Sequence, residues 1–465
     1  MMTWSLAMRN LLRNRRRSLA TLLALCIGSA SILIFGGYSA NIQYSMQTAY
    51  VCSGGHLQVQ HRDYFLYGSG NPTAFGISDY GLIVKAIQAD KFLSPLIKVV
   101  TPTLQFGGVA GNFSAGVSRT VVGTGLVAKD VNQMRQWNQF DLPLFPPRFV
   151  LDGAAEDAAV IGIGVARVLQ LCQVLGVANC PGIEVDQKPG GAQMPKDIEQ
   201  LAQLEGLSAD RPNGLGTARI ELLAGQSHGT PNVVSLSILQ AEGQGFKEFD
   251  EVAVILQLAR AEKLLFGNSA PKATSIMVQL ERSDQMPLAT GHLLRLLAKV
   301  APTQRLAVLD FEMLNPFYVQ TIRLFNMIFG FIFALIGAIV LFTVSNTMNT
   351  AVVERTVEIG TLRAVGLRRA GIRRMFVTEG FLLGFIGAAA GACLALGIAF
   401  VVNRVGLTWL PPGSSEPLPL NLRVWGETQM LLGTTSALVL VAAASAWLPA
   451  YRAARLQIVE ALRHA

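Results

Sequence analysis

The chain has 465 residues, of which 51% are hydrophobic and 15% charged, and its formal net charge at pH 7 is +8. Such a length would suit two or three soluble domains, but a mean hydropathy of +0.41 argues against a soluble protein and for a membrane protein. The sequence contains no metal-ligand spacing such as HExxH, no phosphate-binding loop and no convincing nucleophile–base pair. We therefore predict no catalytic residues and no metal site.

Four stretches contain the roughly 20 apolar residues that the hydrocarbon core of a bilayer requires. We predict transmembrane helices over residues 19–41, 323–348, 377–402 and 428–450. The first stretch is too long for the apolar part of a signal peptide, and no small-x-small cleavage site closes it, so we interpret it as a membrane helix. The predicted fold class is an α-helical membrane protein with four transmembrane helices and a large α+β periplasmic domain inserted between helices 1 and 2.

The distribution of arginine predicts the orientation. Five arginines precede the first span, six lie in residues 354–374 and three follow the last span. Residues 42–320 carry 21 Lys and Arg against 24 Asp and Glu. Basic runs can also bind nucleic acid, but the positive-inside rule explains these better, and we predict no nucleic-acid partner. Both termini are predicted to be cytoplasmic. The remaining segments are a cytoplasmic N-terminal segment at 1–18, a cytoplasmic loop at 349–376, a periplasmic loop at 403–427 and a cytoplasmic tail at 451–465.

The periplasmic domain is predicted to occupy residues 42–322 as two α+β subdomains. A stretch rich in Gly, Pro and charge at about 181–217 is predicted to be a mobile insertion with one short helix near 196–205. Alternating or helical periodicity predicts strands at 56–60, 119–124 and 274–282, and helices at 249–266 and 285–302.

Two Gly-x-Gly stretches and two histidines invite functional interpretations. "GTGLVA" (123–128) and "GIGVAR" (162–167) could begin dinucleotide fingerprints, but both lie on the periplasmic side, so we interpret them as strand-to-helix turns. His56 and His61 flank a predicted strand and are expected to be surface residues rather than ligands.

The five cysteines divide by location. Cys26 and Cys393 lie in spans and are expected to pack without reacting. Cys172 and Cys180 lie in the periplasmic domain, where disulfides persist, and are predicted to pair; two free thiols are the alternative. Cys52 then remains single.

The segment "ERTVEIGTLRAVGLRRAGIRR" (354–374) carries eight charges between two apolar stretches. At about 3 kcal/mol for each charge it cannot lie in hydrocarbon. Helical spacing places Ile359, Leu362 and Val365 on one side, and Glu354, Arg355 and Glu358 largely on the other. Gly366 is predicted to stop this helix. The helix either lies among lipid headgroups or docks a cytoplasmic partner.

The stretch 354–391 resembles the signature of FtsX-like ABC-transporter permeases, a group that includes MacB and the lipoprotein-release subunits LolC and LolE. "LPAYRAARLQIVEALRHA" (448–465) is similar to the closing motif of the family. Residues 249–333 look closest to the lipoprotein-release branch, whereas the 181–217 insertion departs from it. The matching signature residues are Glu354, Arg355, Glu358, Ile359, Gly360, Leu362, Arg363, Ala364, Gly366, Glu379 and Gly380.

The resemblance implies a non-catalytic permease subunit of a bacterial inner membrane, which works with a second copy or paralogue on a cytoplasmic ABC ATPase dimer. ATP and Mg would then bind the ATPase, and this chain would bind no cofactor. Residues 354–366 would form a coupling helix that passes ATPase closure mechanically to the periplasmic domain. Gly384, Gly387 and Gly391 would let the third membrane helix pack closely. The implied coupling residues are Glu354, Arg355, Glu358, Ile359, Gly360, Leu362, Arg363 and Gly366.

The function implied first is extraction of lipoproteins or lipid-linked cargo from the outer leaflet, with a periplasmic carrier or adaptor. MacB-like efflux, antimicrobial-peptide resistance and FtsX-like signalling to a cell-wall hydrolase are the alternatives. A membrane-anchored adhesion or scaffold protein would fit the outer domain but not residues 354–366. Four phenylalanines are spaced so that they lie roughly on one face of the second membrane helix: Phe317, Phe325, Phe329 and Phe333. They are predicted either to line one wall of a cargo cavity or to pack against a neighbouring helix.

Overall fold

The computed structural model describes residues 15–68, 70–143, 147–178, 218–225, 231–245, 247–409 and 418–457. The chain divides into two compact units. The helical unit comprises Met1–Gln47, Pro316–Trp409 and Leu418–Ala465, and the sheet unit comprises Thr48–Asn315 with Leu410–Pro417. The predicted insertion at 181–217, its short helix and Cys180 lie outside the described residues.

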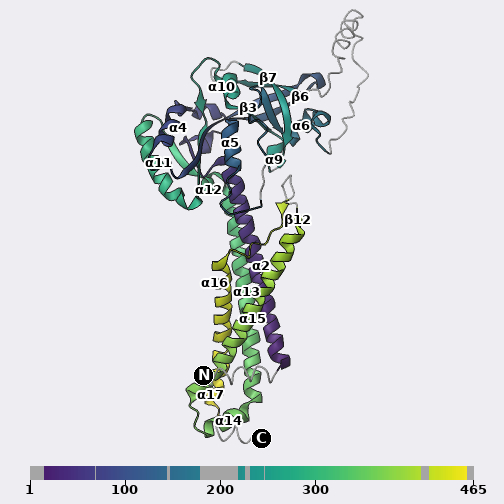
Figure 1. The fold of residues 1–465 in the computed structure, drawn as a ribbon, viewed down its shortest axis with the longest axis vertical. Helices are drawn as coiled ribbons and strands as arrows, with labels where there is room; N and C mark the ends of the chain where they lie inside the picture. Colours follow the sequence, from purple (N-terminus) through teal and green to yellow (C-terminus); the bar gives the residue numbers. More distant parts are fainter. Residues whose placement is uncertain are drawn as a thin grey trace, which may run out of the picture. The chain divides into compact units, whose positions relative to one another are not determined.

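Four long helices dominate the helical unit (Figure 1). They are α2 (Arg15–Gly54), α13 (Pro316–Glu354), α15 (Arg369–Val405) and α16 (Thr428–Ser445). Each contains a stretch that is long and apolar enough to cross a membrane, as predicted. At 1.5 Å per residue, the 40 residues of α2 extend about 60 Å, roughly twice the thickness of a hydrocarbon core. Two short helices, α14 (Thr356–Ala364) and α17 (Trp447–Arg455), also belong to the described part of this unit.

Glycines bring α15 to backbone distance from two neighbours. A Cβ atom added at Gly384 would lie 2.7 Å from Cβ of Ala442 in α16, and one added at Gly391 would lie 2.5 Å from the carbonyl oxygen of Cys26 in α2. Gly380 and Gly387 have equally close neighbours in Ala446 and Leu25. The prediction of close packing by Gly384, Gly387 and Gly391 is confirmed. Small residues four apart allow this approach, which van der Waals contact then stabilises inside a membrane.

We expect Gly391→Ala to destabilise the helical unit by about 1–3 kcal/mol, because the new methyl group would press on the α2 backbone. Gly397→Ala is the matched control on the same helix, since a Cβ there meets no atom within 4 Å. It should leave stability unchanged or raise it slightly through helix propensity. Thermal unfolding in detergent, followed by circular dichroism, compares the two. Equal melting temperatures would contradict the packing argument.

One nine-stranded sheet runs through the sheet unit, in the order β11-β1-β10-β3-β4-β8-β5-β7-β6. Strand β6 also pairs with β3, so that β3, β4, β8, β5, β7 and β6 close into a ring. The strands, in chain order, are β1 (Leu57–His61), β3 (Ile97–Asn112), β4 (Val117–Leu126), β5 (Ala158–Gly162), β6 (Ala218–Gly225), β7 (Pro231–Glu242), β8 (Ala253–Gln257), β10 (Ser275–Leu280) and β11 (Leu306–Asp310).

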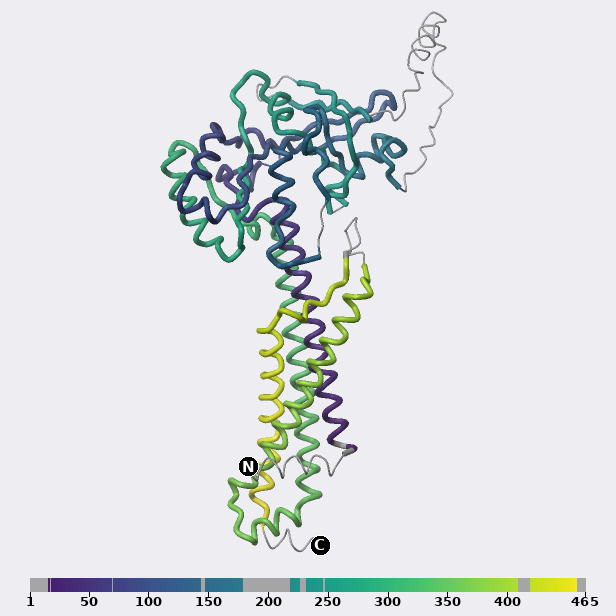
Figure 2. Tube along the Cα trace, viewed as in Figure 1, coloured from purple at the N-terminus to yellow at the C-terminus, as the bar shows by residue number. Residues whose placement is uncertain are grey.

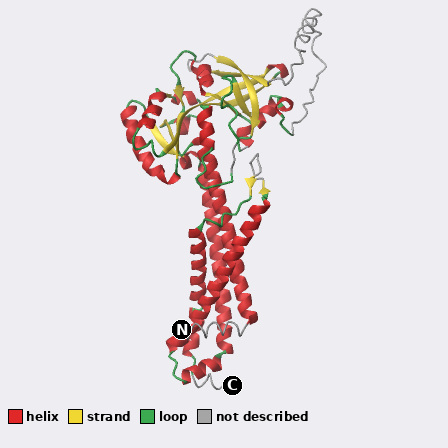
Figure 3. Ribbon diagram, in the orientation of Figure 1, coloured by secondary structure: helices red, strands yellow, loops and turns green. Residues whose placement is uncertain are grey.

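Helices cover this sheet (Figure 3), and its two largest hydrophobic cores lie between helices and strands. One core lies within the ring and includes Phe106, Leu256 and Leu264. The other packs β1 and β10 against α4 (Tyr80–Ala89) and α11 (Met286–Val300), through residues such as Ile87 and Leu293. Because β3 pairs with β10 in its first half and with β6 in its second half, both cores share one strand. The other α-helices and strands described in this unit are α3 (Tyr64–Tyr67), α5 (Ala128–Arg135), α6 (Ile163–Val168), α7 (Cys172–Leu175), α9 (Lys247–Asp250), α10 (Leu258–Phe266), α12 (Phe311–Leu314), β2 (Ile77–Ser78) and β9 (Lys272–Ala273). The short strands β12 (Thr408–Trp409) and β13 (Leu418–Pro419) belong to the helical unit.

Most of the local predictions for this region are confirmed. Strands β1, β4 and β10 and helix α11 lie where periodicity placed them, and both Gly-x-Gly stretches connect a strand to a helix. The single helix predicted at 249–266 is wrong. Residues 253–257 form β8, which pairs with β4 and β5 inside the ring, and this strand separates the short helix α9, which ends at Asp250, from α10, which begins at Leu258. Burial of Val254 and Leu256 on the core side of the sheet outweighs the helical periodicity of the stretch.

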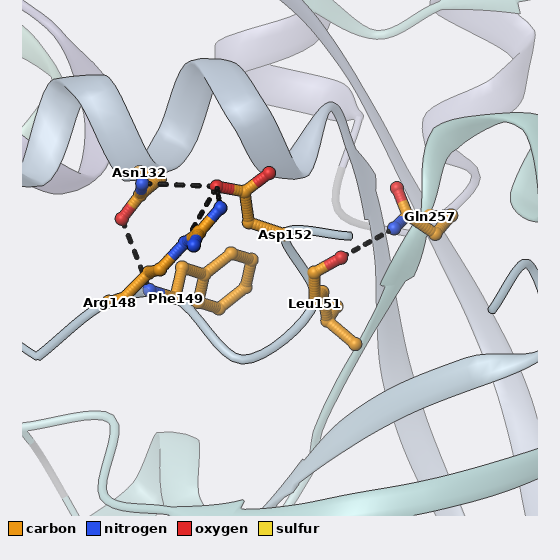
Figure 4. A network of polar contacts seen from close by, with 6 residues as sticks. All are labelled: Asn132, Arg148, Phe149, Leu151, Asp152 and Gln257. Atoms are coloured by element: carbon orange, nitrogen blue, oxygen red, sulfur yellow. Dashed lines mark hydrogen bonds and ion pairs between the residues drawn. The ribbon is translucent and has the colours of Figure 1, made fainter. Parts of the chain in front are cut away.

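A polar network anchors the loop that follows α5 (Figure 4). The amide of Asn132 donates to Asp152 at 3.1 Å and its oxygen accepts the backbone N–H of Phe149 at 3.2 Å, while Arg148 donates to the same carboxylate. Gln257 in β8 donates to the carbonyl of Leu151 at 2.9 Å. The network holds the buried Phe149 and Leu151 against the sheet.

His56 is fully buried, so its predicted surface position is wrong. Its Nδ1 accepts the backbone N–H of Leu280 at 3.0 Å, its Nε2 lies 3.0 Å from Oγ of Ser283, and its ring meets Trp137 edge to face. Beside it, Gln279 donates to the carbonyls of Val51 and Met134. These contacts build the last turn of α2 into the sheet unit. Burial lowers the pKa of His56 to about 4.

This shift predicts acid sensitivity of the sheet unit. In the unfolded chain His56 binds a proton near its ordinary pKa of 6.5, whereas in the folded chain it does so only at about 4. The stabilisation is therefore complete above pH 6.5 and is lost as the pH falls toward 4, by about 3 kcal/mol in total. Urea unfolding followed by tryptophan fluorescence measures it. The variant His56→Gln should show a weaker fall in stability with acid, and parallel curves for the two proteins would contradict the assignment.

Candidate functional site

Helix α13 bends into α14 at Arg355, whose φ of −105° and ψ of 18° are not helical. The helical hydrogen bonds nevertheless continue across the bend, because the N–H of Arg355 donates to Ala351 and its carbonyl accepts the N–H of Ile359. The hydroxyl of Thr356 donates to the carbonyls of Val352 and Val353, at 3.1 and 2.8 Å. Such side-chain bonds to the preceding turn are a known cause of helix bending.

The side chain of Arg355 turns inward at this bend. Its Nη1 lies 2.9 Å from Oε1 of Glu379 in α15, and the two side chains are only 5% and 3% exposed. Helical spacing had placed Arg355 outward with Glu354 and Glu358, and that placement is wrong. The bend rotates Arg355 away from the surface of α14, and Glu379 provides the partner that a buried guanidinium requires.

The inner side of α14 packs on the helical unit. Ile359 is buried in a cluster with Val352, Ile372 and Phe376, and Gly360 is buried beside it. Arg363 is half-buried, and its guanidinium donates to the carbonyl of Leu456, just after α17. Helix α14 is therefore attached at its beginning, its middle and its end.

The stop predicted at Gly366 is confirmed. Gly366 has a φ of +103°, its N–H donates to Arg363, and the N–H of Leu367 donates to Leu362. These two bonds form a Schellman motif, which satisfies the last carbonyls of the helix and favours glycine at the left-handed position. Arg368 then precedes α15.

The surface that α14 leaves exposed is mixed in character. We define the α14 outer face by its exposed apolar and acidic side chains, which are Val353, Glu354, Val357, Glu358, Leu362 and Val365. Leu362 and Val365 were expected to lie on the side of Ile359, but both are exposed, Val365 by 84%. Figure 2 shows α14 at one end of the helical unit, the same end as α17.

Two of the four predicted cavity phenylalanines lie against α2, and a third, Phe333, is half-buried beside them on α13. Phe325 and Phe329 stack on Phe35 of α2, with ring centroids 6.4 and 6.5 Å apart, and Phe333 contacts Phe329. This arrangement matches the alternative of packing against a neighbouring helix. Phe317 is exposed instead. The outward face of α13 carries other large side chains, among them Met327, Phe331 and Phe342, which their helical spacing could have identified.

The cysteines of the described residues differ in state. Cys172 is disulfide-bonded, and since Cys180 lies outside the described residues, its pairing with Cys180 stays a prediction. Cys26, Cys52 and Cys393 are free. The thiol of Cys52 donates to the carbonyl of Trp137.

We expect replacement of only one member of the Arg355–Glu379 pair to lower the stability of the helical unit more than replacement of both members. Glu379→Leu should destabilise the helical unit by about 3–5 kcal/mol, because it leaves a guanidinium buried without its carboxylate. Replacing both residues, as Arg355→Met with Glu379→Leu, should recover most of this loss. Thermal unfolding in detergent measures the destabilisation caused by each single substitution and by both together. If the two side chains contributed independently, the destabilisation of the double variant would equal the sum of the two single values.

Comparison with known proteins places this site inside a recognised region. Residues 327–458, which contain most of α13 and all of α14 to α17, match the family described as FtsX-like permease C-terminal. The lipoprotein-releasing system transmembrane protein LolC of Haemophilus influenzae is 28% identical over 167 residues, 35% of this chain and 39% of that protein. The macrolide export ATP-binding/permease protein MacB of Hyphomonas neptunium is 34% identical over 146 residues, 31% of this chain and 20% of that protein.

An uncharacterized ABC transporter permease of Methanocaldococcus jannaschii is 27% identical over 217 residues, 46% of this chain and 51% of that protein. The chain thus spans about half or less of the length of each of these relatives. The chain carries an FtsX-like permease domain, and its homologues are ABC transporter permeases, LolC and MacB among them.

Two solved structures resemble part of the chain only distantly. The periplasmic region of MacB from Actinobacillus actinomycetemcomitans covers 57% of this chain, with 94% of its own length, at a TM-score of 0.30 and 10% identity. The extracellular domain of YknZ, from Gram-positive bacteria, covers 55% of this chain, with 100% of its own length, at a TM-score of 0.29 and 13% identity. At these scores the likeness supports no conclusion about function.

Proposed function

We propose that this chain is the permease subunit of an ATP-driven, mechanically coupled transporter, and that α14 docks on a separate cytoplasmic ATPase. The observation that carries the proposal is the two-sided character of α14. Its inner side is attached through Arg355, Ile359 and Arg363, while its outer face exposes apolar and acidic side chains at one end of the helical unit. Because α14 is held by the helical unit on its inner side and exposes apolar side chains on its outer face, it is suited to bind a partner and to transmit the motion of that partner to the helical unit.

The other parts of the proposal follow from this role. The sheet unit would be periplasmic, the α14 end and both termini cytoplasmic, and the membrane the bacterial inner membrane. ATP and Mg would bind the ATPase dimer, and this chain would contribute neither cofactor nor catalytic residue. A second permease copy or paralogue would contact the outward face of α13. Only 11% of the residues in the apolar stretch of α13 are buried, against 33–39% in the apolar stretches of the other three membrane-spanning candidates.

The cargo we propose is a lipoprotein or another lipid-linked molecule, taken from the outer leaflet and passed to a periplasmic carrier or adaptor. Similarity to LolC supports it. Similarity to MacB supports efflux or antimicrobial-peptide resistance equally, and signalling to a cell-wall hydrolase is compatible with the same permease domain. The docking of α14 is common to all of these and can be tested first.

Introducing charge on the α14 outer face should abolish docking. We expect Val357→Asp combined with Val365→Asp to reduce co-purification of the ATPase at least about tenfold, because a carboxylate buried in an apolar contact costs more than 1.4 kcal/mol. The chain itself should still fold, since both side chains are already exposed. Pull-down of the ATPase from detergent extracts gives the measurement.

Val109→Asp is the matched control, because Val109 in the sheet unit is 38% exposed, as Val357 is. It should leave ATPase binding unchanged. If α14 instead lies among headgroups, the double variant will retain the ATPase at the wild-type level, and Glu354→Arg with Glu358→Arg will strengthen binding to anionic vesicles. Either result would reject the docking proposal.

A further inference from the structure

The contact between Arg355 and Glu379 links α14 to α15 at a point where the backbone departs from helical geometry. Helix α14 connects to α13 through the bend at Arg355 and to α15 through residues 365–368, where Gly366 has a positive φ. Because helical hydrogen bonds continue across the first joint, α14 would reorient relative to α13 and α15 through a change of the bend angle rather than through free rotation. The 2.9 Å ion pair fixes the first joint directly to α15, 24 residues further along the chain.

The surroundings of the pair make this link stiff. Val352, Ile359 and Phe376 belong to the buried cluster around it, and Gly380, the neighbour of Glu379, packs on Ala446 at the end of α16. In such an interior neither charge can leave its partner without a large desolvation penalty. The planar guanidinium also restricts the geometry of the contact more than an ammonium would.

Beyond Glu379, close packing extends the link to other helices. Gly380 and Gly384 bring α15 against α16, and Gly387 and Gly391 bring it against α2. The hydroxyl of Ser29 in α2 donates to the carbonyl of Ala388 at 3.1 Å. A displacement of α15 at Glu379 would therefore be passed to α16 and α2 through these close contacts.

We propose that Arg355 and Glu379 are a positioning pair that makes α14 and α15 move as one body when the ATPase changes state. The inference rests on the proposed function, because it requires α14 to be the surface on which the ATPase acts. Neither residue belongs to the α14 outer face. Loss of the pair should therefore leave the ATPase bound but loosen the first turn of α14 from α15, so that the buried contacts of Ile359 are the remaining attachment between the two helices.

The test measures one distance within the full chain, bound to its ATPase in lipid nanodiscs. Nitroxide labels are placed at Thr361 on α14 and Val405 at the far end of α15, both exposed, after replacement of Cys26, Cys52 and Cys393. Double electron–electron resonance then compares the nucleotide-free state with the ATP-bound state. In the wild type the distance distribution should stay the same, whereas in Glu379→Gln it should shift or broaden when ATP binds, with the ATPase still present.

Two further variants separate the pair from a general loss of structure. The exchange Arg355→Glu with Glu379→Arg restores an ion pair and should bring the distribution back toward the wild type. Glu427→Gln makes the same chemical change in the 3.3 Å pair with Arg423, elsewhere in the helical unit, and should leave the distribution unchanged. If Glu379→Gln does not fold, Arg355→Lys retains the charge but not the planar geometry, and should broaden the distribution in the ATP-bound state.

The outcomes distinguish this inference from the docking proposal. A distribution in Glu379→Gln that matches the wild type with and without ATP overturns the inference and leaves docking intact. A wild-type distribution that shifts with ATP overturns it as well. Loss of the ATPase from the wild-type chain rejects docking, and with it the inference. Retention of the ATPase by Glu379→Gln together with a shifted distance supports both.

Discussion

The helical unit depends on the approach of α15 to its neighbours at backbone distance. Gly384 leaves room for Ala442 of α16, and Gly391 leaves room for the main chain of α2 at Cys26. Inside a bilayer the hydrophobic effect does not drive helices together, so van der Waals contact and hydrogen bonds between helices must do so. Larger side chains at these positions would remove the contact on which the rest of the unit is built.

The same helix carries the least expected group of the unit, a buried carboxylate. Glu379 lies next to Gly380, one turn before Gly384, so its ion pair with Arg355 and the close packing of α15 form one continuous region. A buried ion pair contributes little net stability compared with apolar side chains of the same size. Its effect is on geometry, because it specifies where the bend between α13 and α14 lies relative to α15.

In the sheet unit, a single long strand has a comparable organising effect. Strand β3 pairs with β10 in one half and with both β4 and β6 in the other, so the two hydrophobic cores cannot separate without breaking its ladder. Closing the ring through β6 also removes two exposed sheet edges, which would otherwise invite pairing with other chains. The buried contacts of His56 and Gln279 build the last turn of α2 into this framework.

Features that depend on a single segment could be predicted from the amino-acid sequence. The four apolar helices, strands β1, β4 and β10, helix α11 and the stop at Gly366 each follow from the length, periodicity or backbone preference of a few adjacent residues. The tertiary structure alone decided which sides of these segments are buried. Residues 253–257 became a strand because β4 and β5 flank them. Phe325 and Phe329 lie against α2 because Phe35 meets them there, and Arg355 turned inward because Glu379, distant in the chain, lies within reach. Burial is a property of the neighbours that a residue acquires on folding, and periodicity within one segment does not specify those neighbours.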